Sequence, residues 1–169
     1  MNISAKKIIL GIDPGSRCTG YGFICEQSGT LSLVKAGAIR LDSIDDMSLR
    51  LAKIFSDLCL LIDEYRPDEA AVEEIFTARN ASSALKLGQA RGAAIVACSR
   101  NNIPVYSYEP TMVKKSIVGA GRAAKEQVAF MVTRLLGCKG GWPRDVSDSL
   151  AVAITHLNQR RMASLKGWK

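Results

Sequence analysis

The chain has 169 residues, of which 47% are hydrophobic, and a formal net charge of +7. This length and composition are typical of one globular domain, and the positive charge favours nucleic acid as a partner over a membrane. No apolar run reaches the roughly 18 residues that a membrane-spanning helix needs, and the N-terminus lacks the pattern of a secretory signal. We therefore expect one cytoplasmic domain over residues 1–169, without a membrane partner and with a flexible basic tail in its last few residues.

The cysteine and histidine content narrows the possible chemistry. The five cysteines are an odd number without a C-x-x-C pair, which argues against a disulfide framework and a structural zinc site. His156 is the only histidine, so catalytic schemes that need two imidazoles are excluded. We expect His156 to be packed or solvated rather than to bind a metal. Any catalysis must therefore rest largely on carboxylates.

The stretch Lys6–Ser16 combines an apolar strand with a Pro-Gly turn, and Asp13 lies where the two meet. A carboxylate at the end of a buried strand needs a cation, hydrogen bonds or a raised pKa. Asp13 either opens a β-turn by capping its own backbone or belongs to a functional site. The carboxylates found later in the chain favour the second interpretation.

The remaining elements follow from the hydrophobic periodicity and the turn residues. Ser28-Gly29 predicts a hairpin turn between the second and third strands. Further strands are predicted at Thr19–Cys25, Leu31–Ile39, Glu69–Phe76 and Ile103–Tyr108, and helices at Asp45–Tyr65, Ala81–Arg100, Pro110–Val118, Lys125–Leu136 and Asp145–Arg161. Hairpins followed by a β-α-β unit indicate an α/β fold with a central mixed five-stranded sheet flanked by helices.

The helix predicted at Ala81–Arg100 carries small residues on one stripe. Ala84, Gly88, Gly92 and Val96 recur at intervals of four, although two glycines within a helix each cost about 1 kcal/mol. A closely packed partner would offset this cost. That partner is either the protein's own sheet or a second copy of the chain, and the pattern does not distinguish the two.

A basic region lies between Thr111 and Arg144. It contains one acid, Glu126, and seven basic residues, namely Lys114, Lys115, Arg122, Lys125, Arg134, Lys139 and Arg144. Such residues are either a solvated surface or a phosphate-binding surface. The C-terminal tail adds Arg160, Arg161, Lys166 and Lys169, and we expect these residues to fray from the last helix.

Asp145 and Asp148 lie three residues apart on one face of the last predicted helix. They either cap the helix and complement its dipole or address a common ligand. Together with Asp13 and Glu73 they supply oxygen ligands, which suit Mg²⁺ or Mn²⁺. Two such ions can activate a water molecule and stabilise the leaving 3′ oxygen of a phosphodiester. The sequence thus predicts a metal-dependent nuclease.

Three stretches resemble the RuvC family of crossover (Holliday) junction endodeoxyribonucleases. They are the first strand and turn with Gly11-Ile12-Asp13-Pro14-Gly15-Ser16-Arg17 and Thr19-Gly20-Tyr21-Gly22, the segment Glu73–Gly92, and the helix start Asp145–His156. The stretches occur in the family's order between Ile8 and His156. The resemblance implies an RNase H-like fold and a homodimer that nicks opposed strands of four-way DNA junctions in recombination and repair.

The resemblance also implies roles for individual residues. The four catalytic acids of the family fall on Asp13, Glu73, Asp145 and Asp148, its DNA-contacting lysines on Lys114 and Lys125, and its base-contacting aromatic on Phe76. We add the basic residues Arg79, Lys115 and Arg122 as candidate DNA contacts. The helix with the glycine stripe corresponds to the dimer-forming helix, and the branch-migration proteins RuvA and RuvB are the implied partners. Glu74 departs from the amide usual in the family, and strand alternation predicts that it faces away from the metal.

Two other functions are compatible with parts of this pattern. An actin-like or sugar-kinase-like ATPase also begins with a strand and an acidic turn, but 169 residues leave no room for its second domain, and no phosphate-loop motif is present. A catalytically inactive junction-binding protein would keep the basic surface without needing four acids. Tight ATP binding would favour the first alternative, and metal-independent binding without nicking would favour the second.

Overall fold

The structure is a computed structural model that describes residues 6–75 and 80–166. The strands are β1 (Lys7–Asp13), β2 (Cys18–Gln27), β3 (Thr30–Arg40), β4 (Glu69–Glu73) and β5 (Val105–Tyr108). The helices are α1 (Met47–Tyr65), α2 (Ala81–Arg100), α3 (Pro110–Val118), α4 (Lys125–Leu135) and α5 (Arg144–Lys166). Each of these elements was predicted from the sequence, with shifts at several ends.

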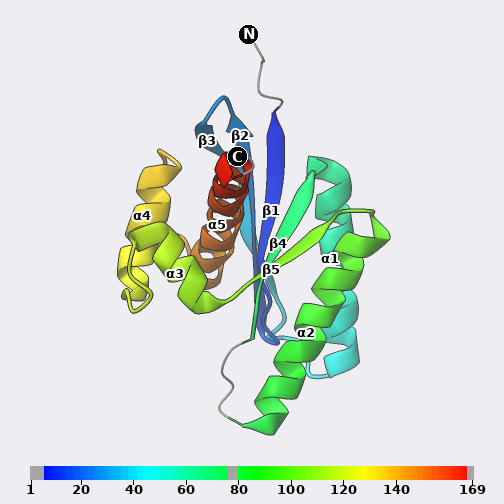
Figure 1. Cartoon of the computed structure of the whole chain (residues 1–169). Coiled ribbons are helices and arrows are strands. Elements are labelled where there is room, and N and C mark those ends of the chain that lie inside the picture. The colour runs from blue at the N-terminus through cyan, green and yellow to red at the C-terminus, as the bar shows by residue number, and fades with distance from the viewer. Residues whose placement is uncertain (1–5, 76–79, 167–169) are drawn as a thin grey trace.

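The five strands form one mixed sheet in the order β3-β2-β1-β4-β5. β1 pairs antiparallel with β2 and parallel with β4, so it is the central strand. Helices α1 and α2 cover one face of the sheet, and α3, α4 and α5 lie on the other (Figure 1). The α/β fold with a mixed five-stranded sheet is therefore confirmed.

The alternation of side chains along β1 divides the core into two layers. Leu10 and Ile12 pack with α1 and α2, whereas Ile9 packs with α5. Asp13 has the same parity as Ile9 and therefore lies on the α5 side of the sheet. The alternation thus directs the carboxylate toward the helix that carries Asp145 and Asp148.

Three glycines let α5 lie directly on the sheet. A Cβ atom on Gly11 would lie 2.0 Å from the carbonyl oxygen of Ser149, and one on Gly20 would lie 2.0 Å from that of Asp145. A Cβ on Gly22 would meet the side chain of Leu150 at 2.4 Å. Because these strand residues have no side chain, the start of α5 comes close to the end of β1.

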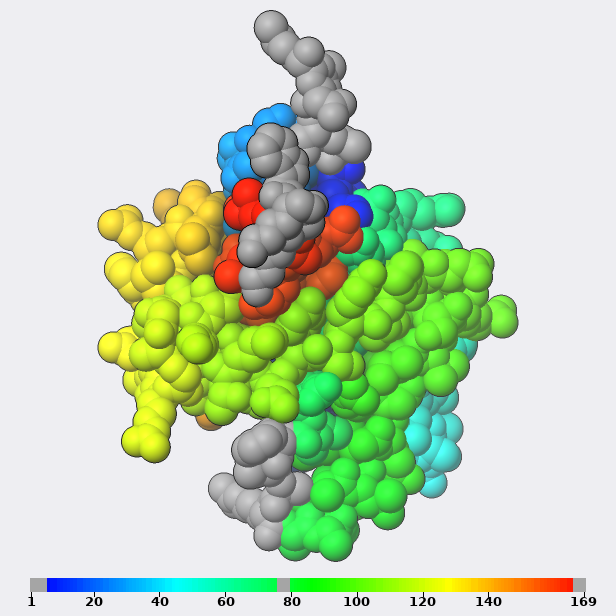
Figure 2. All heavy atoms as spheres, in the orientation of Figure 1, coloured from blue at the N-terminus to red at the C-terminus, as the bar shows by residue number. Residues whose placement is uncertain are grey.

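The helix α2 presents its small-residue stripe to the outside. No atom lies within 4 Å of the position that a Cβ would take on Gly88 or Gly92, and Val96 is exposed. The opposite face of α2 supplies Ala94 and Cys98 to the core. Within the described residues, the stripe therefore does not pack on the protein's own sheet, which removes one of its two interpretations. Figure 2 shows the side chains of α2 (green) on an open face of the molecule.

Two expectations about element ends were wrong. β4 ends at Glu73 rather than at Phe76, so strand alternation does not extend to Glu74. α5 continues to Lys166, and Arg160 and Arg161 do not fray, since they form ion pairs with Glu69 and Glu26. Acids on two strands thus hold Arg160 and Arg161 in the helix.

The buried and half-buried cysteines form no disulfide, as expected. His156 is buried and hydrogen-bonded, so the expectation that it is packed is confirmed. Across residues 6–75 and 80–166, no helix is both long and apolar enough to span a membrane.

Candidate active site

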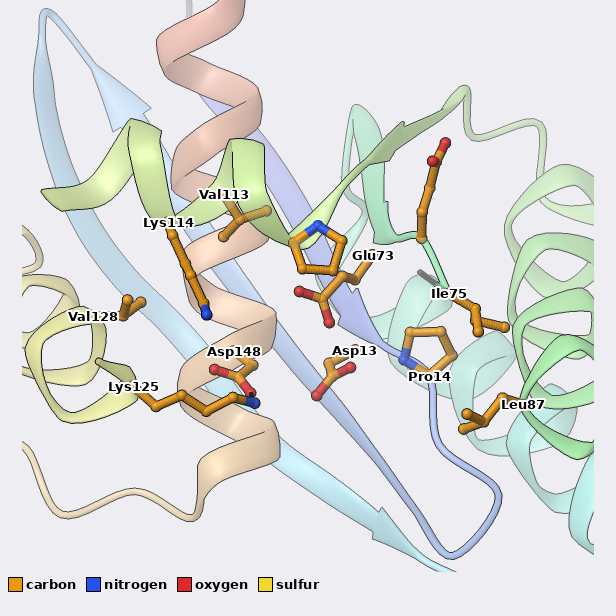
Figure 3. A pocket seen from close by; sticks show the side chains of 12 residues that line it. Asp13, Pro14, Glu73, Ile75, Leu87, Val113, Lys114, Lys125, Val128 and Asp148 are labelled. Atoms are coloured by element: carbon orange, nitrogen blue, oxygen red, sulfur yellow. Dashed lines mark hydrogen bonds and ion pairs between the residues drawn. The ribbon is translucent and has the colours of Figure 1, made fainter. Parts of the chain in front are cut away.

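Three carboxylates from separate elements line one pocket of about 360 Å³. Asp13 ends β1, Glu73 ends the neighbouring parallel strand β4, and Asp148 lies in the first turns of α5. In Figure 3 their side chains point toward one another. β1 and β4 pair up to Ile12 and Val72, one residue before the two acids, so the sheet register itself places Asp13 beside Glu73.

Burial dominates the electrostatics of this pocket. It raises the pKa of Asp13 well above the usual value, and the charges of Glu73, Asp148 and Asp145 raise it further. The pKa of Glu73 is also raised, first by burial and then by the charge of Asp148. Carboxylates that raise one another's pKa in this way are an arrangement typical of a functional site rather than of a structural one.

Two lysines reach the same pocket from the α3 and α4 side. Lys114 and Lys125 point into it in Figure 3, and Nζ of Lys125 lies 3.1 Å from Oδ2 of Asp148. The positive charges of both lysines partly offset the raised pKa of Glu73. The acids of the pocket can therefore bind a metal ion, and the two lysines beside them can bind a phosphate.

Asp145 lies beside the pocket rather than in its lining. Its charge contributes to the raised pKa of Asp13, which places it near the other three acids. Burial and then a hydrogen bond with Asp145 raise the pKa of the Cys18 thiol to about 11. The structure thus brings all four predicted acids to one end of the sheet, with Asp145 at the edge of the group.

The donor set of the pocket fits a hard divalent cation. Asp13, Glu73 and Asp148 offer only oxygen ligands, which Mg²⁺ and Mn²⁺ prefer. A cation would also relieve the repulsion that raises the pKa of Asp13. In the observed side-chain arrangement, no group of three or more acidic, histidine or cysteine side chains in the described part of the chain is positioned to hold a metal ion. In this arrangement Lys125 pairs with Oδ2 of Asp148 and so occupies one of the two oxygens that the carboxylate can offer a metal.

The other candidate DNA contacts differ in their positions. Lys115 lines a separate hollow with Asn158 and Met162, so the structure does not bring it to the acids. The reason is that neighbouring residues of a helix face different sides. Arg122 is exposed between α3 and α4. Phe76 and Arg79 lie outside the described residues.

Two residues at the site were not predicted. Glu74 is among the residues that line the pocket, and because β4 ends at Glu73, strand alternation no longer fixes the direction of its side chain. Arg144 lies 4.0 Å from Asp148, with its Nε atom directed at the carboxylate oxygen Oδ2. The spacing of four residues on a helix is a signal from which this second pair was predictable.

The strand order of the sheet, together with the acids Asp13 and Glu73 at the ends of β1 and β4, defines a nuclease of the RNase H-like fold. Residues 9–156 match the family described as crossover junction endodeoxyribonuclease RuvC. A protein of that name from Oleidesulfovibrio alaskensis is 59% identical over 157 residues, which cover 93% of this chain and 94% of the relative. Another from Solidesulfovibrio magneticus is 54% identical and covers 95% of both chains.

A solved structure agrees with these relatives. The structure of Thermus thermophilus RuvC in complex with a Holliday junction substrate has a TM-score of 0.88 and 34% identity to this chain. The match covers 94% of this chain and 97% of the Thermus chain. The chain therefore belongs to the RuvC family of crossover junction endodeoxyribonucleases. It is a structure-selective, metal-dependent nuclease that resolves Holliday junctions.

Proposed function

We propose that the protein binds four-way DNA junctions as a homodimer and nicks opposed strands with Mg²⁺ held by Asp13, Glu73, Asp145 and Asp148. Mn²⁺ is expected to substitute, because it prefers the same oxygen ligands. The observation that supports this proposal is the convergence of three carboxylates in one pocket beside Lys114 and Lys125.

Different residues of the pocket would bind the cation and the substrate. When bound, Mg²⁺ would lower the pKa of the attacking water and stabilise the leaving 3′ oxygen. Asp13 and Glu73 are fixed by the buried strands that carry them, so they offer ligand oxygens in a constant position. Asp148 supplies a ligand from the facing helix, and Asp145 adds charge from the edge of the site.

The two lysines of the pocket are proposed to bind phosphates. Lys114 and Lys125 point into the pocket from helices on one side of it, next to the acids (Figure 3). A phosphate that approaches the acids meets these ammonium groups first, which offsets the repulsion between two anions. Lys125 would exchange its pairing with Asp148 for a phosphate oxygen as the metal takes over the carboxylate.

The exposed stripe of α2 supports the proposed homodimer. Leu85 and Val96 are 64% and 55% exposed, and the two glycines between them leave open space above the backbone. Small residues at intervals of four allow a second helix to approach closely. A dimer would also present two active sites, as symmetric cutting of opposed strands requires.

Family membership supports two further parts of the proposal. The partners of the nuclease at the junction would be RuvA and RuvB, and its place of action would be the cytoplasm. Co-purification of the wild-type chain with RuvA and RuvB bound to a synthetic junction tests the first, and failure to co-purify under conditions where RuvA and RuvB bind the junction would contradict it.

Cleavage of a synthetic four-way junction tests the active site. The wild type is expected to nick opposed strands with Mg²⁺ or Mn²⁺ and to leave the junction intact in EDTA. Asp13→Asn is expected to bind the junction but not to cut it. Asp57→Asn is the matched control, because Asp57 pairs with Lys53 on the surface of α1 and lies outside the pocket. Normal cutting by Asp13→Asn would contradict the proposed site, and binding without cutting by the wild type under any divalent ion would favour an inactive junction-binding protein.

A further inference from the structure

A second hollow of about 370 Å³ adjoins the catalytic pocket. It shares Lys125 and Asp148 with that pocket and extends between α4 and the start of α5. Trp142, Arg144 and Ser147 also line it, and we refer to it as the Trp142 hollow. A DNA strand with a phosphate at the acids would therefore have the Trp142 hollow directly beside that phosphate.

Ser147 shows that the hollow has an unused hydrogen-bonding group. This side chain is 4% exposed, and its hydroxyl oxygen has no hydrogen-bond partner among residues 6–75 and 80–166. Buried hydroxyl groups are nearly always hydrogen-bonded, since an unpaired one loses its bonds to water without replacement. The neighbouring Ser149 follows this rule by donating to the carbonyl oxygen of Val146 at 2.7 Å. The oxygen is itself enclosed, so a polar ligand in the hollow would supply the missing partner once the Ser147 side chain turns toward it.

The lining of the hollow combines an aromatic ring with cations. Trp142 is half-buried, packs on the hydrophobic core and also borders the hollow. Lys125 and Arg144 supply positive charge at the side shared with Asp148, and a second acid, Glu126, also lines the hollow. An indole ring is a platform on which any base can stack, and the basic groups fit the phosphates that flank the base. A nucleotide supplies both features in one ligand.

We propose that the Trp142 hollow binds the base of a nucleotide adjoining the cut phosphate, with Trp142 stacking on the base and Ser147 hydrogen-bonding to it. This proposal rests on the proposed function, because it requires the cut strand to pass the acids. It makes Trp142 a substrate-binding residue that holds an unstacked base next to the reacting phosphate, so the stacking on Trp142 must offset the free energy of unpairing and unstacking that base.

The fluorescence of Trp142 tests the stacking directly. The chain has two tryptophans, so Trp168→Phe leaves Trp142 as the only one. Junction DNA without metal is expected to quench the fluorescence of this variant. Junctions with one abasic site in each of the two cut strands, moved together one nucleotide at a time across the mapped cut positions, should lose the quenching at one position. Equal quenching by every abasic junction, or none by the intact one, would overturn the proposal.

Binding and cleavage by Trp142 variants give the second test. Trp142→Leu keeps an apolar side chain on the core but removes the stacking, and we expect about tenfold weaker binding of the intact junction. Trp142→Phe should restore most of the affinity, and the abasic junction that abolishes quenching should bind both variants equally. Phe130→Leu is the matched control, because Phe130 is an exposed aromatic residue of α4 that does not line the hollow.

The two proposals fail in different ways. If the wild type does not cut a junction with any divalent ion, the proposed function is wrong. If the wild type cuts normally and folded Trp142→Leu binds and cuts with unchanged constants, only the Trp142 hollow is wrong. Should Trp142→Leu fail to fold, the quenching by abasic junctions in Trp168→Phe decides the matter alone.

Discussion

Nε2 of His156 lies 2.6 Å from Oε2 of Glu69, which begins β4, and His156 lies about two turns along α5 from Asp148. The step from Glu69 to Glu73 spans about 13 Å of strand, and the step from His156 to Asp148 spans about 12 Å of helix. Because these two lengths agree, the hydrogen bond between His156 and Glu69 aligns α5 with β4 so that Asp148 meets Glu73. The pair thus connects a buried polar contact to the geometry of the active site.

The Glu69 carboxylate is held by several partners. Lys7 lies 2.8 Å away, Arg160 also pairs with it, and the Tyr108 hydroxyl donates to Nδ1 of His156 at 2.7 Å. Burial alone would raise the pKa of Glu69, but the hydrogen bonds from Arg160, Lys7 and His156 outweigh burial and lower it to about 2. Burial lowers the pKa of His156, so the ring is neutral at pH 7 and accepts from Tyr108.

The first prediction concerns Glu69→Gln. A lowered carboxylate pKa stabilises the fold above the unfolded pKa of about 4.5, and this contribution is lost as the pH falls toward about 2. We expect Glu69→Gln to reduce the free energy of unfolding by about 3 kcal/mol at pH 7 and by much less near pH 2. Urea denaturation at several pH values measures this difference. A difference that stays constant with pH would contradict the assignment of the ion pairs.

The second prediction concerns Asp13→Asn and has the opposite sign. A carboxylate whose pKa is raised by folding loses stability as the pH rises through the folded pKa. Without metal at pH 7.5, Asp13→Asn should therefore melt a few degrees above the wild type, since each kcal/mol shifts Tm by about 2–4 °C in a domain of this size. The gap should close below about pH 4. Mg²⁺ should raise the Tm of the wild type but not that of the variant, and equal melting temperatures in EDTA would show that Asp13 is not under electrostatic strain.

The third prediction concerns Gly11→Ala. The added methyl group would lie 2.0 Å from a backbone oxygen of α5, so the helix must move away from β1. We expect the free energy of unfolding to fall by about 1–3 kcal/mol. The rate of cleavage should fall by a larger factor than the stability, because the same movement displaces Asp148 from Asp13. Gly121→Ala is the matched control, since its added methyl makes only an ordinary contact of 3.5 Å. Wild-type cleavage by Gly11→Ala would show that the acids do not depend on the close packing of α5.

The fourth prediction concerns the proposed dimer. Gly92→Leu adds a side chain where a single chain leaves open space, so the variant should fold normally and its helix propensity should rise. A second helix packed on the stripe would be displaced, and we expect at least a tenfold weaker dimer by analytical ultracentrifugation. Ser56→Leu adds the same side chain to the exposed face of α1 and should leave the association unchanged. An unaltered dimer in Gly92→Leu would place the interface elsewhere.

The periodicity of the sequence predicts the fold well, for physical reasons that particular residues show. Apolar side chains alternate along β1 because both faces of the sheet are buried. Leu58 and Ile62 recur at helical spacing because α1 packs on one of these faces. The acids were predictable because Asp13 and Glu73 end strands, where a charge has no role in packing. Three of the four then meet in one pocket, with the fourth beside it.

Features that depend on where an element ends were not predictable from a single chain. β4 ends at Glu73, which pairs with Tyr108 at the end of β5, and Glu74 follows at the pocket. α5 runs to Lys166, and the ion pair that holds Arg160 in the helix is with Glu69, which lies on a strand 91 residues away. Ser147 lies next to the predicted acids, yet its missing hydrogen-bond partner becomes visible only once α5 is packed.

The central claim is that the acids act as one site, and a double-mutant cycle of junction cleavage tests this most directly. Asp13→Asn and Asp148→Asn are each expected to slow cleavage by about a hundredfold or more at saturating Mg²⁺, with junction binding retained. The double variant should be no slower than the slower single variant, because either change alone already disables a shared metal site. Effects that multiply, so that the double variant loses the product of the two single losses, would contradict a site in which both carboxylates serve the same cations.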